Sequence, residues 1–497
     1  MTRTLALPPA LSKEIRALFP LWGTTVAAVA AGFAWRKADM LDLRLFAYVA
    51  GSIAIGAQSI GQEYSYRTLP TLLSQPDDRS RLYGRKFLVS TAMLLALAVL
   101  ALAASAHQPH RAVWPLSVVV WPPLCGLFLA PLMTMTCRST LAGMILSGSL
   151  PPFVWIVTLA IARLGFGINV DAAGPLILGG LTLVMIVLCP LAGVLGWRRF
   201  ATIEAIEVAT PSLQLPAWLT RSHGARRRSP FNALVVKELH LQQMAFVVAG
   251  FYVVGWMSLV LLQRYIPALE TFPVGAMVLL YSVGLTMTIG ALASAEERHH
   301  GTLDWQVLQP IPAWQQWIVK LAVTFGLALL FGVAQPVLMI RMTPHEGLRT
   351  IHLPANLTVL VVLVTAGSVY ISSLANSGVR AIVMSLPIGL AITYFVQMVT
   401  SAFRWVMLKL AGPLIADIVA GRIATSSMQL SDAIAFLGRA FLLTLAPFVL
   451  WLAFFNHGSS ERSAGRIVRQ AAAIAILITA GIILTGGVLA SYELRPH

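Results

Sequence analysis

Thirteen long apolar runs restrict this chain to one class of fold. A helix needs about 20 apolar residues to cross a bilayer. Only helices and closed barrels cross it, because lipid offers no hydrogen bonds to free backbone groups. The runs therefore predict an all-α polytopic membrane protein. They lie near residues 18–35, 43–61, 87–106, 113–136, 140–162, 174–196, 244–263, 272–295, 317–340, 355–375, 380–402, 437–455 and 470–490.

The composition agrees with this fold class and excludes several others. Of the 497 residues, 58% are hydrophobic and 11% are charged, against about 25% charged in soluble domains. These figures exclude a soluble multidomain enzyme. The runs contain no HExxH, no GxSxG and no acid pair, which argues against an intramembrane enzyme. Cys125, Cys137 and Cys189 are widely spaced and form no CxxC pair, so we predict neither a disulfide framework nor a metal site.

The order of the runs indicates two halves. Six runs are followed by a polar linker, six more runs and one further run. We expect a first transmembrane half over 1–200, a cytoplasmic linker over 201–232, a second half over 233–458, and an extra C-terminal helix within 459–497. The segment 406–424 is apolar but interrupted by charges. A re-entrant helix there keeps the count at 13 spans, whereas a true span would make 14 and move the C-terminus to the other side.

Positive charge sets the expected orientation. The chain has 35 Lys and Arg against 19 Asp and Glu, a net charge of +16. Basic loops usually stay on the cytoplasmic side beside anionic lipid, which fits a cytoplasmic N-terminus. The basic segments carry no interleaved aromatic residues, so we expect no nucleic-acid partner.

Acidic residues are absent from the apolar runs as drawn above. Ion-coupled carriers usually keep such an acid as their coupling site, although it costs about 2.5–3.5 kcal/mol at the centre of a span. This absence argues against a secondary transporter.

An internal repeat is the most informative feature for function. Segments 63–86 and 297–320 match without gaps, each with an acid, a Thr-Leu pair, a Gln-Pro pair and a Lys. Each segment follows the second run of its half, so both lie on the same side of the membrane. The match predicts a parallel tandem repeat of two six-helix bundles.

A second match precedes the first run of each half. Lys13-Glu14 in one half corresponds to Lys237-Glu238 in the other. Apolar residues recur around Lys13 and Glu14 at helical spacing, which predicts a short amphipathic helix at the membrane interface.

The repeated loop is predicted to be short and rigid. Thr68 and Leu69 should begin a short helix with an apolar face, and Pro76 should end it. We expect Glu63 and Glu297 to lie at the cytoplasmic boundary and to brace their loops through a basic side chain or a loop backbone amide. The candidate basic partners are Lys86 or Arg79 for Glu63, and Lys320 for Glu297. Such an element can pass a push from a soluble partner to the spans.

This pattern resembles the coupling loop of ABC-2 type transporter permeases. In that family six spans form a half-transporter, the loop after the second span docks on an ATPase subunit, and an elbow helix precedes the first span. The resemblance implies that Lys13, Glu14, Lys237 and Glu238 belong to elbow helices. It also implies a set of ATPase-coupling residues: Glu63, Thr68, Leu69, Pro76, Arg79, Lys86, Glu297, Gly301, Thr302, Leu303, Pro310 and Lys320.

The sequence departs from the family pattern in a few places. Arg67 stands where the family has Gly, and Ala313 stands where Arg is usual, so the two loops are expected to dock with unequal strength. The thirteenth span is an addition. No P-loop pattern occurs, so ATP and Mg²⁺ would bind a separate subunit and no cofactor is expected on this chain.

By this resemblance, the chain is expected to be the permease of an ABC transporter in a bacterial cytoplasmic membrane. Two copies of an ATPase subunit would be its partners, and export would be the direction of transport. The substrate stays open among lipid, peptide, drug, ion and polysaccharide. The alternative is a non-transport membrane scaffold or sensor, which has no evident need for a duplicated coupling loop.

Overall fold

The computed structural model describes most of the membrane domain. The described residues are 8–34, 41–65, 68–106, 116–160, 174–203, 230–263, 274–299, 311–342, 353–375, 377–385, 444–457 and 463–493, with several more between 387 and 399. The predicted coupling residues Gly301, Thr302, Leu303 and Pro310 lie outside them, as do the segment 406–424 and most of the linker.

All regular structure within the described residues is helical. The helices up to the linker are α1 (Pro9–Ala34), α2 (Leu41–Ser65), α3 (Leu69–Leu73), α4 (Arg79–Ala106), α5 (Leu116–Leu124), η2 (Cys125–Leu129), α6 (Ala130–Cys137), α7 (Thr140–Ala160) and α8 (Gly174–Thr202). After the linker come α10 (Pro230–Leu241), α11 (Gln243–Gln263), α12 (Val274–His299), α14 (Ala313–Leu329), η6 (Leu330–Ala334), α15 (Gln335–Met342), α17 (Leu353–Leu374) and α19 (Ala464–Glu493). Two shorter apolar helices cover Gly378–Gly389 and Thr444–His457.

Eight helices of the described part are long and apolar enough to cross a membrane. The chain is therefore a multi-pass helical membrane protein, as the apolar runs predict. A helix of 20 residues spans about 30 Å, so α1 and α2, with 26 and 25 residues, also have the required length.

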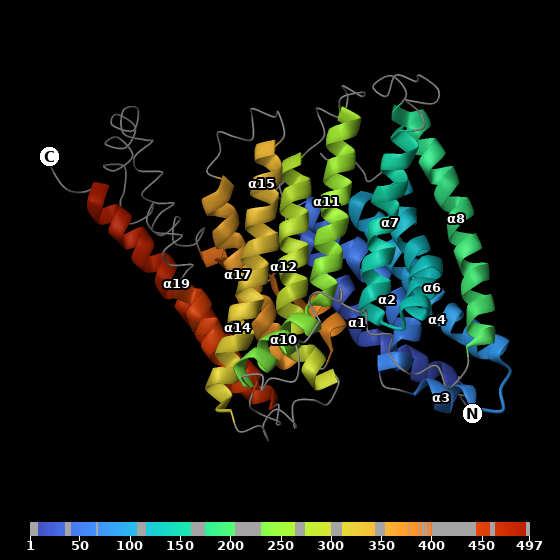
Figure 1. Ribbon diagram of the computed structural model, residues 1–497, viewed down its shortest axis with the longest axis horizontal. Coiled ribbons are helices and arrows are strands. Elements are labelled where there is room, and N and C mark those ends of the chain that lie inside the picture. Colours follow the sequence, from blue (N-terminus) through green and yellow to red (C-terminus); the bar gives the residue numbers. More distant parts are fainter. Residues whose placement is uncertain are drawn as a thin grey trace, which may run out of the picture.

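The two groups of helices lie side by side (Figure 1). Helices α1 to α8 occupy the right of the view and α11 to α19 the left, with α7 next to α11. One buried apolar cluster draws residues from both groups, among them Ile55 of α2 and Leu292 of α12. The helices α3 and α10 lie at the same, lower end of the molecule (Figure 1).

Small residues bring the helices around α2 into close contact. A Cβ atom added to Gly56 would stand 1.6 Å from the carbonyl oxygen of Gly126, which lies in the π-helical turn η2. A Cβ atom on Gly61 would stand 2.2 Å from the Thr140 hydroxyl at the start of α7. Glycine at these positions lets the backbones approach, a common device in membrane helix packing. As a result α2 is held firmly within its group.

The predicted amphipathic helix before each first span has a different form in the two halves. In the first half it is not separate, because α1 runs without a break from Pro9 to Ala34. In the second half α10 ends at Leu241 and α11 begins at Gln243. The intervening Gln242 side chain donates to the carbonyl of Ile289, 2.9 Å away, and so ties the break to α12. The sequence expectation was therefore wrong for the first half.

Candidate functional site: two buried ion-pair clusters

A buried lysine joins three helices at the lower end of the first group. Lys86 of α4 lies 3.0 Å from both carboxylate oxygens of Glu14 on α1, and 2.9 Å from Oε1 of Glu63 on α2. Its ammonium group also donates to the carbonyl oxygen of Ser59, 3.2 Å away. We call Glu14, Glu63 and Lys86 the first ion-pair cluster.

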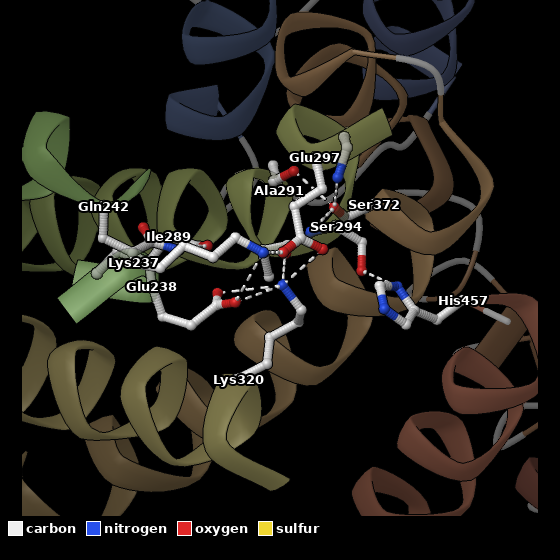
Figure 2. A network of polar contacts seen from close by, with 12 residues as sticks. Lys237, Glu238, Gln242, Ile289, Ala291, Ser294, Glu297, Lys320, Ser372 and His457 are labelled. Carbon is white, nitrogen blue, oxygen red and sulfur yellow. Dashed lines mark hydrogen bonds and ion pairs between the residues drawn. The ribbon is translucent and has the colours of Figure 1, made fainter. Parts of the chain in front are cut away.

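The second group contains the same arrangement (Figure 2). Lys320 of α14 lies 3.1 Å from both carboxylate oxygens of Glu238 on α10, and 2.8 Å from Oε2 of Glu297 on α12. It also donates to the carbonyl oxygen of Ala293, 2.7 Å away. Glu238, Glu297 and Lys320 form the second ion-pair cluster.

The two clusters agree in sequence spacing as well as in geometry. The lysine follows the carbonyl that it contacts by 27 residues in both clusters. That carbonyl belongs to the residue one helical turn before the glutamate, at Ser59 before Glu63 and at Ala293 before Glu297. The same three helix positions are therefore joined by the same chemistry at two places in one chain.

Both clusters are shielded from solvent. The exposed fractions are 3% for Lys86 and 2% for Glu63, and both Lys320 and Glu297 are 0% exposed. A buried charge is tolerated when it is paired and hydrogen-bonded. Each lysine meets that condition with several oxygen acceptors, so the clusters fix how their helices meet.

A second lysine balances the charge at each place. Lys237, on α10, lies 2.6 Å from Oε1 of Glu297. Lys13, on α1, is exposed and adds a favourable electrostatic interaction with Glu63. With these lysines each cluster contains two positive and two negative groups.

The predicted partners of the two loop glutamates are confirmed by these distances, with one exception. Glu63 pairs with Lys86 and Glu297 pairs with Lys320. Arg79 was the second candidate for Glu63, and that expectation was wrong. Its guanidinium group instead donates to the carbonyl oxygens of Ala201, at 2.6 Å, and Ile203, at 3.1 Å, at the end of α8.

The acids lie deeper in the helices than the apolar runs suggest. Helix α2 continues to Ser65 and α12 continues to His299, so both include their glutamates. One candidate span, Met277–Arg298, contains Glu296 and Glu297. The apolar run drawn to residue 295 therefore stops short of the end of this span, whose last residues include the two acids, and a lysine on a neighbouring helix compensates each loop glutamate. A fixed lysine partner favours a structural role for these acids over an ion-coupling role.

The first loop is braced against the spans as predicted. Helix α3 covers Leu69–Leu73, and the side chains of Leu69 and Leu72 are buried against Tyr83 and Phe200. The Thr68 hydroxyl donates to the carboxylate of Glu63. Pro76 lies in the exposed bend after α3, where the helix has ended. The loop is thus tied to α2 at its start and to α8 at its end.

The sequence did not reveal that the two repeated motifs meet. The Lys-Glu pairs before each half and the loop glutamates were treated as separate features, yet Glu14 and Glu238 bind the same lysines as Glu63 and Glu297. The sequence signal that could have revealed this contact is the presence of opposite charges at matching positions of the two halves. Each half contains a lysine at its third span, one glutamate before its first run and another just after its second run.

Comparisons with known proteins add no identification. Searches of protein-family models, curated proteins and solved structures found no match to this chain.

Proposed function

We propose that this chain is the membrane-spanning permease of an ATP-binding-cassette transporter. On this proposal the two helix groups are a parallel tandem repeat of ABC-2-like halves, and α19 is an added helix. A separate ATPase, in two copies, supplies the energy and carries ATP and Mg²⁺. The protein resides in a bacterial cytoplasmic membrane with its N-terminus inside and exports its substrate.

The pair of ion-pair clusters is the observation that carries this proposal. Each cluster ties a glutamate that precedes the first apolar run of its group to the second and third spans, near the ends that the connecting loop joins. A push on a loop held in this way moves three helices together. A protein with no mechanical input has no use for two such devices at one end of the molecule.

The exposed face of the first loop is the expected contact with the ATPase. Thr71, Ser74 and Gln75 point away from the packed side of α3 and are exposed. Since Leu69 and Leu72 hold the other side, the exposed side chains can be changed without removing the support of the loop.

The test is co-purification of the chain with an ATPase from its native membrane. The double variant Thr71→Arg, Gln75→Arg should lose the ATPase, because two large cations alter the docking face alone. Met342→Arg is the control, because Met342 is 72% exposed and ends the helix stack α14–η6–α15 far from α3. If no ATPase co-purifies with the wild type, a scaffold or sensor function is favoured. Full binding by the double variant would exclude this loop as the docking site.

A further inference from the structure

An open groove runs along the outside of the first helix group. It lies between α4, η2 and α8 and has a volume of about 450 Å³. Ligand sites of small molecules measure about 300–1,000 Å³. The lining is Ser80, Tyr83, Gly84, Phe87, Phe128, Pro190, Gly193, Val194 and Trp197.

The shape of the groove follows from its lining residues. On α4 and on α8 the lining positions recur at three- and four-residue intervals, so each helix presents one continuous face to the groove. Gly84 and Gly193 leave space on these faces, because neither has a side chain. The Phe128 ring of η2 forms the floor of the groove, and it lies so close to α8 that a Cβ atom on Gly193 would stand 2.5 Å from the ring. Apart from Ser80 and Tyr83 the lining is apolar or aromatic, as a hydrocarbon chain requires.

One end of the groove is basic. The contact between Arg79 and the carbonyl of Ala201 brings the start of α4 beside the end of α8.

Five arginines and two aspartates lie within 77–85 and 198–199, a net charge of +3. Arg85 is paired with Asp77 at 2.7 Å, and Asp78 accepts a hydrogen bond from Ser80. Arg81, Arg198 and Arg199 are exposed, so the excess positive charge faces the surroundings of the groove. Trp197, beside them, is the residue type that marks the headgroup level of a bilayer.

Tyr83 contributes its ring to the groove. The residue lines the groove and is 8% exposed. Its buried hydroxyl faces Gly196 of α8, where an added Cβ atom would stand 3.3 Å away, and Met135 and Leu132 of α6 also lie close to that position. The hydroxyl is therefore enclosed between helices, and an occupant of the groove meets the ring.

We propose that this groove binds one anionic phospholipid from the surrounding leaflet. Its acyl chain lies along Phe87, Phe128 and Val194, and its phosphate lies between Arg81 and Arg198. The bilayer is the source of this ligand, because the groove opens sideways between two membrane helices whose outer faces are exposed. This site does not depend on the transporter function proposed above.

The bound lipid would contact the support of the first loop. Tyr83 packs on Phe200 with ring centroids 5.3 Å apart, and both residues belong to the cluster that buries Leu69 and Leu72 of α3. Occupancy of the groove therefore stabilises the position of α3.

The experiment measures lipid retained by the full-length protein in micelles that contain equal amounts of phosphatidylglycerol and phosphatidylcholine, by native mass spectrometry. The wild type should retain one phosphatidylglycerol in preference to phosphatidylcholine. Gly84→Leu should abolish this, because the side chain fills the groove while an added Cβ atom at Gly84 meets no other atom. Gly179→Leu, at an exposed glycine of α8 with equally free surroundings, is the matched control and should behave as the wild type.

A further variant tests the headgroup end of the lipid. Arg198→Gln should lower the preference for phosphatidylglycerol by about fivefold, the effect of one arginine near an anionic surface. Equal retention of the two lipids by the wild type, or undiminished retention by Gly84→Leu, would overturn the proposal.

Discussion

At the scale of single residues, Lys86 and Lys320 carry the largest energetic consequences. Removing one partner of a buried ion pair typically costs about 3–5 kcal/mol, because the remaining charge is left uncompensated. Lys320→Met should therefore destabilise the protein by about that amount in a detergent unfolding titration. Arg469→Met is the control, because Arg469 is exposed on α19 and should change stability little.

Removing all charges of one cluster separates electrostatics from packing. Lys86→Met alone leaves Glu14 and Glu63 without the buried cation that they share, and the exposed Lys13 is then the nearest positive charge named in the cluster. The triple variant Lys86→Met, Glu14→Gln, Glu63→Gln contains no net charge in the cluster and should recover part of the lost stability. A triple variant less stable than Lys86→Met would contradict this explanation and indicate that hydrogen bonds of the carboxylates dominate.

Thr68 gives the most selective test of the link between loop and spans. Thr68→Val removes the hydroxyl that donates to Glu63 and leaves the Lys86 ion pairs in place. If the transporter proposal holds, substrate-stimulated ATP hydrolysis should fall, because the loop is then less firmly attached to α2. Thr68→Ser keeps the hydroxyl and should retain the activity. Equal activity of the Val and Ser variants would show that this contact does not transmit force.

At the scale of elements, α3 depends on two buried leucines. A five-residue helix is not stable alone, because helix nucleation is costly. Leu72→Ala leaves a cavity under α3, and substitutions of this kind cost about 2–5 kcal/mol. Amide hydrogen exchange of residues 69–74 should increase in Leu72→Ala and stay unchanged in Thr71→Ala, whose side chain is exposed. Protection that persists in Leu72→Ala would mean that α3 is held by other contacts.

Helix α19 is docked through a buried amide pair. Asn456 and Gln470 exchange two hydrogen bonds of 3.0 Å, and the Tyr370 hydroxyl donates to Gln470 at 3.0 Å. Gln470→Leu should cost about 1–3 kcal/mol, since it removes both hydrogen bonds between the two buried amides.

A double-mutant cycle measures this coupling. Asn456→Leu combined with Gln470→Leu should cost less than the sum of the two single variants, because each single variant already removes the hydrogen bonds between the two amides. Unfolding in detergent provides all four free energies. Additive effects would contradict the view that this pair is what holds α19.

At the scale of the whole molecule, the two helix groups share one core. The buried apolar cluster includes residues of α2, α4, α12 and α17, so neither group can bury its inner face alone. A chain cut between Leu215 and Pro216 should yield two fragments that co-purify when expressed together. Each fragment expressed alone should aggregate or be degraded. A stable, monodisperse single fragment would contradict the shared core.

The sequence predicted the helical membrane class, the short helix α3 and the pairing of Glu63 with Lys86. These features depend on local patterns and on chemistry that repeats at fixed spacing. It did not predict that Glu14 and Glu238 join the same clusters, nor that α1 is continuous. Those features depend on how closely helices approach, which is set by contacts such as Gly56 with Gly126 between distant segments.

The residue before each loop glutamate differs between the two clusters, which shows that the clusters can accept different substitutions during evolution. Gln62 donates to Glu14 at 2.9 Å, whereas Glu296, before Glu297, accepts from the Gly378 amide instead. In an assembly of two identical subunits, every substitution would appear in both ion-pair clusters at once. A single chain that carries both places can inherit a change at one and keep the other intact. One cluster is thus free to acquire a new role while its counterpart preserves the original fold.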